Sequence, residues 1–340
     1  MPIVYKRDNK NVDFNIVLDI LKKAFNGRSF DSVDLIEKAF LNSLKVVYAY
    51  DDNKLIGFAR AIGDSTWASI YNVALLPSYQ GKGIGKAIIR DLVEQLGKRH
   101  IFTFTHPKTV SLYERMGFRR TKMAYKYVGI NIDEVSKWQE ERGFLLPFGY
   151  KFENEYNKKV SFHEKKNVEK VEGNINIRYS SNLSDASFEE INDLLSDAFN
   201  EKRDIEKTKE DFLASQNFEL AFHNDKLVGI ARLVTDGVRE ALLLNVATLT
   251  SYQGHGIALE IINRLAKQVE GFDIFLHAHP GSYSFYNSKD VFRRYRTAFA
   301  LEPNNFPSEI EEAFFLPEGY RFSNEFYDEE MKYFKGKIYD

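Results

Sequence analysis

The chain of 340 residues contains no cysteine. This absence excludes disulfide bonds, thiolate nucleophiles and every zinc site that has cysteine ligands. Long apolar runs are also absent: a membrane-spanning helix needs roughly 18 residues, and runs such as 241–244 are far shorter. The first seven residues lack the charged and then apolar layout of a signal peptide. The sequence therefore predicts a cytoplasmic protein without a membrane segment.

The chain as a whole has little excess of either sign of charge, with a net charge of −2, but positive and negative residues are distributed unevenly along the sequence. Residues 1–157 carry +6, residues 158–174 carry +2 and residues 175–340 carry −10. Opposite charges could favour packing of the two halves or attract a cationic substrate, although solvated faces without a partner are the simpler interpretation. The chain has no basic helix and no basic stripe interleaved with aromatic residues, so no nucleic-acid partner is predicted.

The sequence repeats itself once, with offsets of 170 to 174 residues. The recurring segments are 54–60 and 226–232, 72–74 and 245–247, 78–81 and 251–254, 118–120 and 292–294, and 146–152 and 316–322. A repeat this long indicates two copies of a full domain and not a solenoid. We therefore predict a first copy at 1–157, an exposed linker at 158–174 and a second copy at 175–340.

Within the first copy, hydrophobic periodicity predicts an α/β domain with a mixed sheet. The expected helices are 12–25, 83–96 and 109–116, and the expected strands are 44–50, 55–62, 67–76, 101–105 and 118–128. The first two strands form a plausible hairpin through Asp51, Asp52 and Asn53.

The segment from Val73 to Lys86 runs from a strand into a helix and is rich in glycine. Glycines let the backbone come close to a ligand, and free N–H groups at a helix start form an anion site. Lys82 and Lys86 would add positive charge there. The alternative is a glycine-rich turn with two solvated lysines. A Rossmann motif is excluded because its glycine spacing is absent, and a P-loop is excluded because Ala87 follows Lys86.

Two motifs together resemble the GNAT superfamily of acyl-CoA-dependent N-acetyltransferases. Gln80, Gly83 and Gly85 match the Q/R-x-x-G-x-G/A signature of motif A, and residues 112–118 (Leu-Tyr-Glu-Arg-Met-Gly-Phe) are similar to motif B. The second copy repeats both in weaker form, through Gln253, Gly256 and Ala258 and then Phe285, Tyr286 and Phe292. The resemblance implies two tandem GNAT-type domains that pack as an intramolecular pseudodimer, each with a mixed, mostly antiparallel sheet flanked by helices.

The resemblance also implies roles for individual residues. The backbone of Val73, Ala74 and Leu75 would pair with the pantetheine arm of acetyl-CoA, and the N–H of Leu75 would polarise the thioester carbonyl. The residues expected around the pyrophosphate are Gln80, Gly81, Lys82, Gly83, Ile84, Gly85 and Lys86. Tyr113 would protonate the leaving thiolate; its alternative is an aromatic residue packed on a helix face. A weaker second site would comprise Gln253, Gly254, His255, Gly256, Ile257, Ala258 and Tyr286.

The acceptor side gives fewer signals. Asp64, which recurs as Asp236, could hold a cationic acceptor, or it could be a turn residue that bonds its own backbone. Asn72 could point into the acceptor cleft, but a carboxamide is not a base. His277 and His279 lie two apart on an expected strand and could share a metal; a third ligand is lacking, so a structural role is favoured and no metal is predicted.

The resulting prediction is direct transfer of an acetyl group from acetyl-CoA to a primary amine of a small molecule. Transfer is expected within a ternary complex, because the chain has no cysteine to carry the acyl group. Two alternatives stay open: a non-catalytic protein that binds or senses acyl-CoA, and a protein or peptide N-acetyltransferase. We expect the first copy to be the working site. In the second copy His255 replaces Lys82, Leu259 replaces Lys86 and Val291 replaces Gly117.

Overall fold

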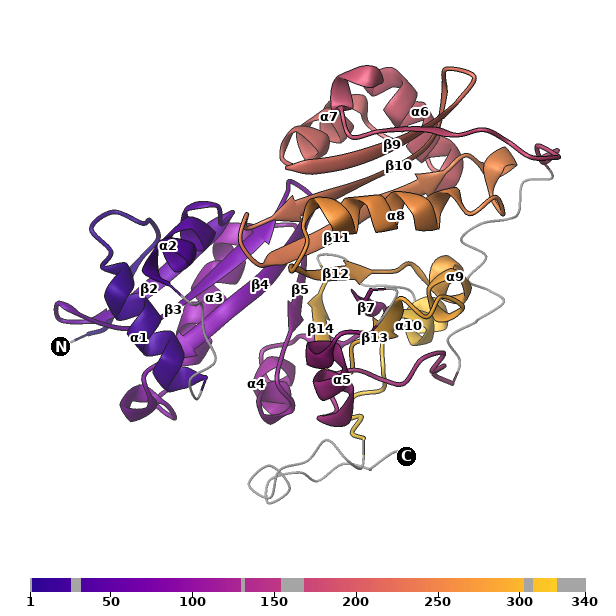
Figure 1. The fold of residues 1–340 in the computed structure, drawn as a ribbon. Helices are drawn as coiled ribbons and strands as arrows, with labels where there is room; N and C mark the ends of the chain where they lie inside the picture. Colours follow the sequence, from indigo (N-terminus) through magenta and orange to yellow (C-terminus); the bar gives the residue numbers. More distant parts are fainter. Residues whose placement is uncertain (1, 26–31, 130–131, 154–167, 303–307, 323–340) are drawn as a thin grey trace.

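The computed structural model describes residues 2–25, 32–129, 132–153, 168–302 and 308–322. They form two mixed sheets of seven strands, each flanked by helices (Figure 1). One neighbouring pair in each sheet is parallel, and the other pairs are antiparallel. The expected class, two α/β units with mixed and mostly antiparallel sheets, is confirmed.

The first sheet has the strand order β1-β2-β3-β4-β5-β14-β6. Its strands are β1 (Val4–Lys6), β2 (Lys45–Asp51), β3 (Lys54–Gly63), β4 (Trp67–Leu75), β5 (His100–Phe104), β14 (Ala298–Leu301) and β6 (Arg119–Arg120). The first-copy helices are α1 (Phe14–Ala24), α2 (Val33–Leu41), α3 (Ile84–Leu96), α4 (Val110–Glu114) and α5 (Glu134–Glu141), with short 3-10 turns η1 (Pro77–Tyr79) and η2 (Pro107–Thr109).

The second sheet has the order β13-β7-β12-β11-β10-β9-β8. Its strands are β13 (Phe292–Arg294), β7 (Ala124–Tyr127), β12 (Asp273–His277), β11 (Glu240–Thr248), β10 (Lys226–Thr235), β9 (Asn217–His223) and β8 (Arg178–Ser180). The second-copy helices are α6 (Phe188–Phe199), α7 (Ile205–Leu213), α8 (Ile257–Gln268), α9 (Tyr283–Asn287) and α10 (Ser308–Phe314), with 3-10 turns η3 (Leu183–Asp185), η4 (Thr250–Tyr252) and η5 (Pro280–Ser282).

The two copies exchange one strand each. β14 of the second copy lies between β5 and β6 of the first sheet, and β7 of the first copy lies between β12 and β13 of the second (Figure 1). The single strand expected at 118–128 is therefore wrong: it is two strands, β6 and β7, in different sheets. Alternation of apolar residues has the same period in both strands, so the pattern does not specify which sheet each one joins.

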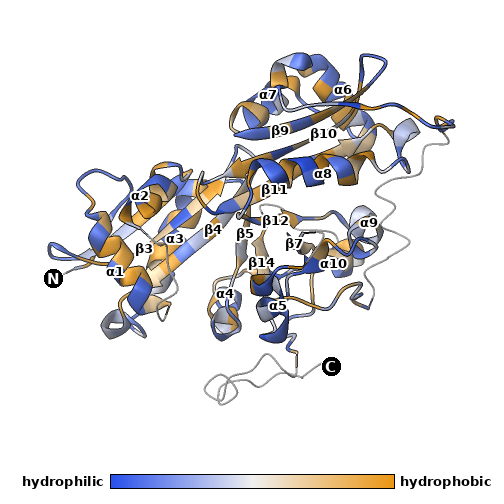
Figure 2. Cartoon of the chain, viewed as in Figure 1, coloured by the Kyte–Doolittle hydropathy of each residue, from blue (hydrophilic) through white to orange (hydrophobic). Residues whose placement is uncertain are grey.

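Each sheet is covered on both faces. The apolar side of α3 packs on one face of the first sheet, and α1 with α2 packs on the other. In the second sheet α8 and the pair α6–α7 take these places. Ile88, Ile89 and Leu92 of α3 are fully buried, and each such side chain contributes about 1.5–3 kcal/mol on burial. Figure 2 shows hydrophobic and hydrophilic residues together on α8, whereas α5 is mainly hydrophilic.

Three elements of the first copy had no counterpart in the sequence prediction: β1, α2 and α5. All three are short, with three, nine and eight residues, and isolated helices of that length depend on tertiary packing. Part of the expected linker, 158–167, lies outside the described residues. The remainder, 168–174, forms no helix or strand, and Val171 donates its N–H to the carbonyl oxygen of Ser251 at 3.0 Å.

Two reciprocal ion pairs join the copies. Arg60 Nη2 lies 2.7 Å from Asp236 Oδ2, and Arg232 Nη2 lies 2.5 Å from Asp64 Oδ2. All four side chains are fully enclosed, with 0% exposure. A buried charge that loses its partner is strongly unfavourable. The pairs therefore fix the two halves of the chain against each other.

We expect Asp236→Asn to lower the free energy of unfolding by about 3–5 kcal/mol, because it leaves the Arg60 cation buried without its counter-charge. The amide keeps an oxygen for the N–H groups of residues 238–240 that now bond Asp236 Oδ1. Chemical denaturation measures the change. Adding Arg60→Met should recover part of the loss, and a double variant as unstable as the sum of the two single variants would contradict a direct coupling.

Candidate functional site

A bulge opens the sheet of each copy at the same place. The parallel pairing of β4 with β5 runs from Trp67 opposite His100 to Ile70 opposite Thr103, and within the described strands it goes no further. The antiparallel register between β3 and β4 shifts at the same level, where Asn72 has a left-handed φ of 50°. In the second copy, the β10–β11 register shifts at Asn245, whose φ is 52°. Beyond each bulge, β4 and β11 continue without β5 and β12 beside them.

The guanidinium groups of the buried ion pairs also hold these bulges. Arg60 Nε donates to Asn72 Oδ1 at 2.6 Å, and Arg232 Nε donates to Asn245 Oδ1 at the same distance. A left-handed backbone is unfavourable for most side chains and least so for asparagine, aspartate and glycine. Each arginine therefore links the aspartate of the other copy to the bulge of its own.

Helix α3 begins just after the open part of β4, and its first turn has no side-chain cap. Each of the helices α1, α2, α5, α6 and α7 has an N-cap side chain that accepts a backbone N–H of the first turn. These N-cap residues are Asp13, Ser32, Asp133, Ser187 and Asp204 respectively. By contrast α3 and α8 start at Gly83 and Gly256, neither of which supplies such a bond. The N–H groups of these two helix starts are therefore available to an anion.

The turn that leads into α3 is exposed and open. Gly81 and Gly83 have φ values of 76° and 82°, a conformation that favours glycine. Apart from its chain neighbours and nearby helix backbone, a Cβ atom built at Gly81, Gly83 or Gly85 would meet no described protein atom within 4 Å. Gln80 ties the turn to the end of β4, because its Nε2 donates to the carbonyl oxygen of Leu75 at 3.1 Å. The Lys82 ammonium lies 5.2 Å from the ring centre of Tyr79.

Tyr113 lies on α4 and is buried, with 3% exposure. Its ring stacks on Phe299 of the exchanged strand β14 at 5.8 Å and meets Phe118 edge-on at 5.4 Å. Burial raises the pKa of the Tyr113 hydroxyl, and hydrogen bonds with Thr103 and Thr105 act in the opposite direction. Thr103 is the last β5 residue paired with β4, so the phenol hydroxyl lies where the two strands part.

In the second copy the corresponding features surround a cavity of about 1010 Å³. Its lining includes the β11 bulge, the start of α8 and Tyr286, and among the residues of the expected second site it contains Gln253, Gly254, Gly256, Ile257, Ala258 and Tyr286. Burial raises the pKa of Tyr286. His255 is not part of the lining; its Nε2 is hydrogen-bonded to the carbonyl oxygen of Val171 at 2.8 Å.

Asp64 is a structural residue in this fold. Its Oδ2 is paired with Arg232, and its Oδ1 accepts the N–H groups of Thr66 and Trp67 at 2.8 and 2.7 Å. These bonds agree with the interpretation of Asp64 as a turn residue that bonds its own backbone. The complete burial of the Asp64 side chain does not favour contact with an acceptor. The side-chain oxygen of Asn72 is bonded to Arg60, and its expected place in the acceptor cleft stays a prediction.

The two histidines of the second copy have different surroundings. His279 caps η5, where its Nδ1 accepts the N–H of Gly281 at 3.3 Å. The ring of His277 stacks on Phe102 at 3.5 Å, and burial lowers the pKa of His277 to about 3. Over the described part of the chain, no three acidic or histidine side chains gather as a metal site, and no helix there is long and apolar enough to cross a membrane.

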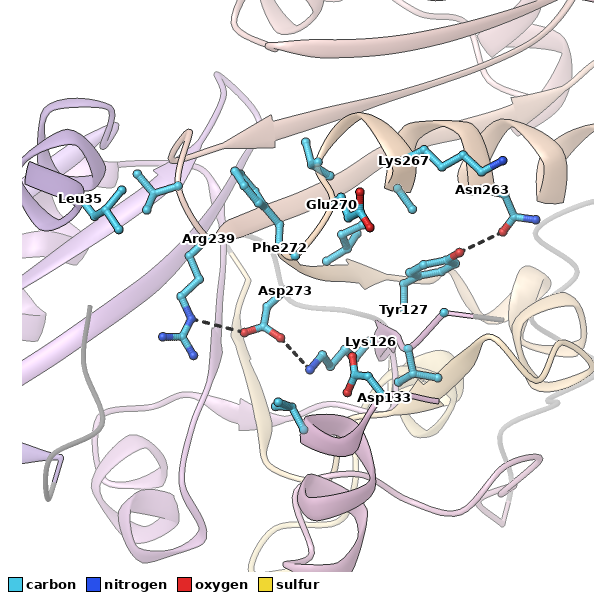
Figure 3. Close-up of a pocket in the computed structure, with 18 residues that line it drawn as sticks. Leu35, Lys126, Tyr127, Asp133, Arg239, Asn263, Lys267, Glu270, Phe272 and Asp273 are labelled. Atoms are coloured by element: carbon cyan, nitrogen blue, oxygen red, sulfur yellow. Dashed lines mark hydrogen bonds and ion pairs between the residues drawn. The ribbon is translucent and has the colours of Figure 1, made fainter. Parts of the chain in front are cut away.

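A second cleft, of about 640 Å³, lies at the opposite end of α8 from its glycine start (Figure 3). Both copies line it, and Figure 3 shows Lys126 and Arg239 directed at the Asp273 carboxylate, at 2.6 and 3.6 Å. Tyr127 donates its hydroxyl hydrogen to Asn263 Oδ1 at 3.1 Å. No motif in the sequence marks the residues of this cleft.

Glu240, the first residue of β11, is paired in register with Asp273 beside this cleft. Burial, together with the carboxylates of Asp273 and Asp236, raises the pKa of Glu240 to about 8. Arg60 and Arg239 oppose this shift. At neutral pH the Glu240 carboxyl group is therefore largely protonated.

Comparison with known proteins gives the family. The sequence profile described as "Acetyltransferase (GNAT) domain" matches residues 42–120, and that described as "Acetyltransferase (GNAT) family" matches residues 185–288. The chain is 32% identical over 121 residues to an uncharacterized N-acetyltransferase, ycf52, of Pyropia yezoensis. The matched region covers 34% of this chain and 70% of that protein. The chain belongs to the GNAT family of acetyltransferases. The sequence resemblance and the expectation of an N-acetyltransferase enzyme are thereby confirmed.

Other GNAT relatives match shorter parts. A [ribosomal protein bS18]-alanine N-acetyltransferase of Haemophilus influenzae is 33% identical over 82 residues, which cover 23% of this chain and 56% of that protein. Among solved structures, a tandem GNAT protein from the clavulanic acid biosynthesis pathway is similar over 90% of this chain and all of that chain, with a TM-score of 0.50 and 13% identity. At this identity the likeness concerns the fold, which in both chains contains two GNAT units.

The roles of Arg60 and Arg232 and the place of His277 on a cavity wall were not predicted from the sequence. A signal for the arginines was present, because Arg60 and Asp64 recur together as Arg232 and Asp236. The pairing across copies was not visible, since each arginine bonds an aspartate more than 160 positions away in the chain.

The raised pKa of Glu240 predicts that stability falls as the pH rises. Between about pH 4.5 and 8 the folded chain keeps a proton that the unfolded chain has released, so the unfolding free energy decreases, by at most about 1.4 kcal/mol per pH unit. Glu240→Gln should flatten this dependence, with the largest gain over the wild type near pH 8. Denaturation from pH 5 to 8 measures it; parallel profiles for the two proteins would contradict the assignment.

Proposed function

We propose that this GNAT protein transfers an acetyl group from acetyl-CoA to a primary amine of a small molecule, directly and within a ternary complex. The observation that carries the proposal is the conjunction, in one place, of the opened β4 edge and an uncapped helix start. The bulge at Asn72 frees the edge of β4 from β5, and the helix that follows starts at Gly83 without a side-chain cap. Acetyl-CoA fits these two features in order: its extended thioester arm would lie along the open edge of β4, and its pyrophosphate would lie at the helix start.

On the donor side, the exposed backbone of Val73 to Leu75 would pair with the amides of the pantetheine arm as an added strand does. The N–H of Leu75 would polarise the thioester carbonyl. The N–H groups at the start of α3 would bind the pyrophosphate, with Lys82 and Lys86 beside it. The open space at Gly81, Gly83 and Gly85 supports this placement.

Tyr113 would supply the proton for the leaving group. The amine nitrogen forms a bond to the carbonyl carbon, the C–S bond breaks, and the thiolate takes the phenol proton while the amine's surplus proton passes to water. A pKa raised by burial keeps the phenol protonated at neutral pH, as a proton donor must be. The hydrogen bonds with Thr103 and Thr105 would provide a route by which a proton returns to the phenolate.

The first copy would be the working site and the second the weaker one. Two fixed positive charges beside the pyrophosphate, Lys82 and Lys86, are replaced by His255 and Leu259. Of these, His255 is already hydrogen-bonded to Val171. The second copy would thus bind CoA with less electrostatic support, although its cavity retains Tyr286 and the glycine start of α8.

The second candidate acceptor is a protein N-terminus, because the Haemophilus influenzae relative is named for acetylating an alanine of a ribosomal protein. Free thiol released from acetyl-CoA, measured with a panel of small amines and with peptides that carry a free N-terminal alanine, distinguishes the two. Mass spectrometry then locates the added acetyl group. Thiol release with neither class of acceptor above the rate of hydrolysis would refute transfer to amines.

Substitution at Gly85 tests the pyrophosphate site without straining the backbone, because its φ is not left-handed, unlike that of Gly83. Gly85→Leu should weaken CoA binding by about tenfold or more, roughly 1.4 kcal/mol, since the side chain enters the space that the pyrophosphate would occupy. Stability should hold or rise, because leucine favours a helix more than glycine does. Titration calorimetry with CoA measures the affinity of the variant for CoA.

Gly85→Ala is the matched control for this substitution, since alanine stands at the corresponding position of the second copy, Ala258. It should bind CoA nearly as the wild type does. If a folded Gly85→Leu protein bound CoA with unchanged affinity in each step of the titration, the first-copy turn would be excluded as the pyrophosphate site.

Tyr113→Phe and Tyr286→Phe compare the two copies. With saturating acetyl-CoA, we expect Tyr113→Phe to reduce turnover by roughly 100-fold, as the loss of a general acid does, and Tyr286→Phe to have little effect. Steady-state thiol release measures both. Equal losses would indicate two working sites, and a loss confined to Tyr286→Phe would place the reaction in the second copy.

A further inference from the structure

The cleft of about 640 Å³ at the carboxyl end of α8 lies apart from the sites discussed so far. The expected CoA sites are at the helix starts Gly83 and Gly256, whereas this cleft is lined by the last turns of α8, by β7 and by the start of α5. Among the described residues, it shares no lining residue with the 1010 Å³ cavity. Its volume is typical of small-molecule sites. The proposed transfer reaction gives this cleft no role.

The repeated fold does not by itself produce this cleft. In the first copy, Arg99 ties the end of α3 to the turn after β3, because its Nε donates to the carbonyl oxygen of Asp64 at 2.6 Å and its Nη1 to that of Leu96 at 2.7 Å. Phe272 stands at the corresponding position of the second copy, one residue before β12. A phenyl ring has no hydrogen-bond donor, so the end of α8 is not tied to its neighbours in this way.

Half of the charged side chains of the cleft are already bonded within the protein. Lys126, which is 3% exposed, bonds Asp273 at 2.6 Å and Gln139 at 2.7 Å. Asp133 accepts the N–H of Ser136 at the start of α5. The charged lining residues are Lys126, Arg239, Lys267, Asp133, Glu270 and Asp273. Within the described residues, the side chains left without a hydrogen bond are therefore two cations, Arg239 and Lys267, and one acid, Glu270. This excess of cations favours an anion.

Arg239 is the cation best placed for an anion. Its Nε lies 3.6 Å from Asp273 Oδ2, which is too long for a hydrogen bond, and its side chain is 48% exposed. Its backbone N–H is bonded to Asp236 Oδ1 at 2.8 Å, so the arginine projects from a fixed turn. Glu240 is largely protonated at neutral pH and adds no negative charge beside Asp273. A guanidinium group with free N–H donors binds a carboxylate through two parallel hydrogen bonds.

Apolar side chains from both copies complete the lining. Leu35 and Val135 of the first copy are 38% and 56% exposed, which is unusual for large hydrophobic residues of this chain. Phe272 of the second copy presents its half-buried ring to the same space (Figure 3). Single exposed apolar residues are common on protein surfaces, but these three line one cleft together. They favour a ligand with an apolar body.

We propose that this cleft is a further ligand site of the chain, separate from both CoA sites, and that it binds a carboxylate with an apolar body through Arg239. The guanidinium group bonds both carboxylate oxygens, and the apolar lining encloses the body. A free carboxylic acid and an α-amino acid share this chemistry. The first leaves Glu270 unused, whereas the ammonium group of the second pairs with Glu270. The inference does not depend on the proposed function.

Three probes with the same phenyl ring test the ligand class: 3-phenylpropanoate, L-phenylalanine and 2-phenylethylamine. Titration calorimetry at pH 7 without CoA measures their affinities. We expect both carboxylates to bind, and 2-phenylethylamine, which has no carboxylate, to bind about tenfold or more weakly. Tighter binding of L-phenylalanine than of 3-phenylpropanoate would assign the site to amino acids, and the reverse order would assign it to free acids.

Arg239→Gln tests the residue. It should weaken the binding of both carboxylates by about tenfold or more, while the melting temperature of the free protein stays nearly the same because the side chain is half exposed. Arg264→Gln is the matched control. It removes the same charge from an exposed position of α8 that does not line the cleft, and it should leave the affinities unchanged.

Four results would overturn the proposal: no binding of either carboxylate by the wild type at millimolar concentration, a preference for the amine, unchanged affinity in Arg239→Gln, or an equal loss in Arg264→Gln. The titrations need neither CoA nor turnover. Their failure is therefore distinguishable from a failure of the proposed acetyl transfer.

Discussion

Two guanidinium groups connect the assembly of this protein to the geometry of its candidate sites. Arg60 bonds Asp236 of the other copy through one nitrogen and Asn72 of its own bulge through another, and Arg232 repeats the arrangement with Asp64 and Asn245. Four buried charges of this kind are stable only as pairs. The packing of the copies and the opening of each sheet therefore depend on the same side chains.

The strand exchange has a similar effect over a larger area. Because β14 completes the first sheet and β7 completes the second, neither sheet is whole without the other copy. Phe299 of β14 stacks on Tyr113, so the environment of the proposed proton donor of one copy is set by a strand of the other. The two copies are therefore one folding unit in space, although their sequences are consecutive.

Within this common frame the copies have diverged. The first copy keeps two lysines at an open turn, whereas the second has Leu259 and a histidine, His255, that is hydrogen-bonded to Val171. Conversely, the second copy has an imidazole on a cavity wall where the first has Phe104. The two copies therefore differ both at the turn that leads into the helix and at the ring that stacks between the sheets.

The duplication, the α/β class, the main helices and strands and the family could be predicted from the sequence, because these follow from local periodicity, glycine turns and motif order. The sequence also indicated the glycine start of α3, which is a local feature. The sequence did not determine the division of 118–128 into β6 and β7, the partners of Arg60 and Arg232, or the exposure of His277 to a cavity. Those depend on contacts between residues more than 100 positions apart, and side-chain alternation is the same in whichever sheet a strand lies. Which carboxylate each buried cation meets follows from the packing of the two copies, because a buried charge is paired by its position in space and not by distance along the chain.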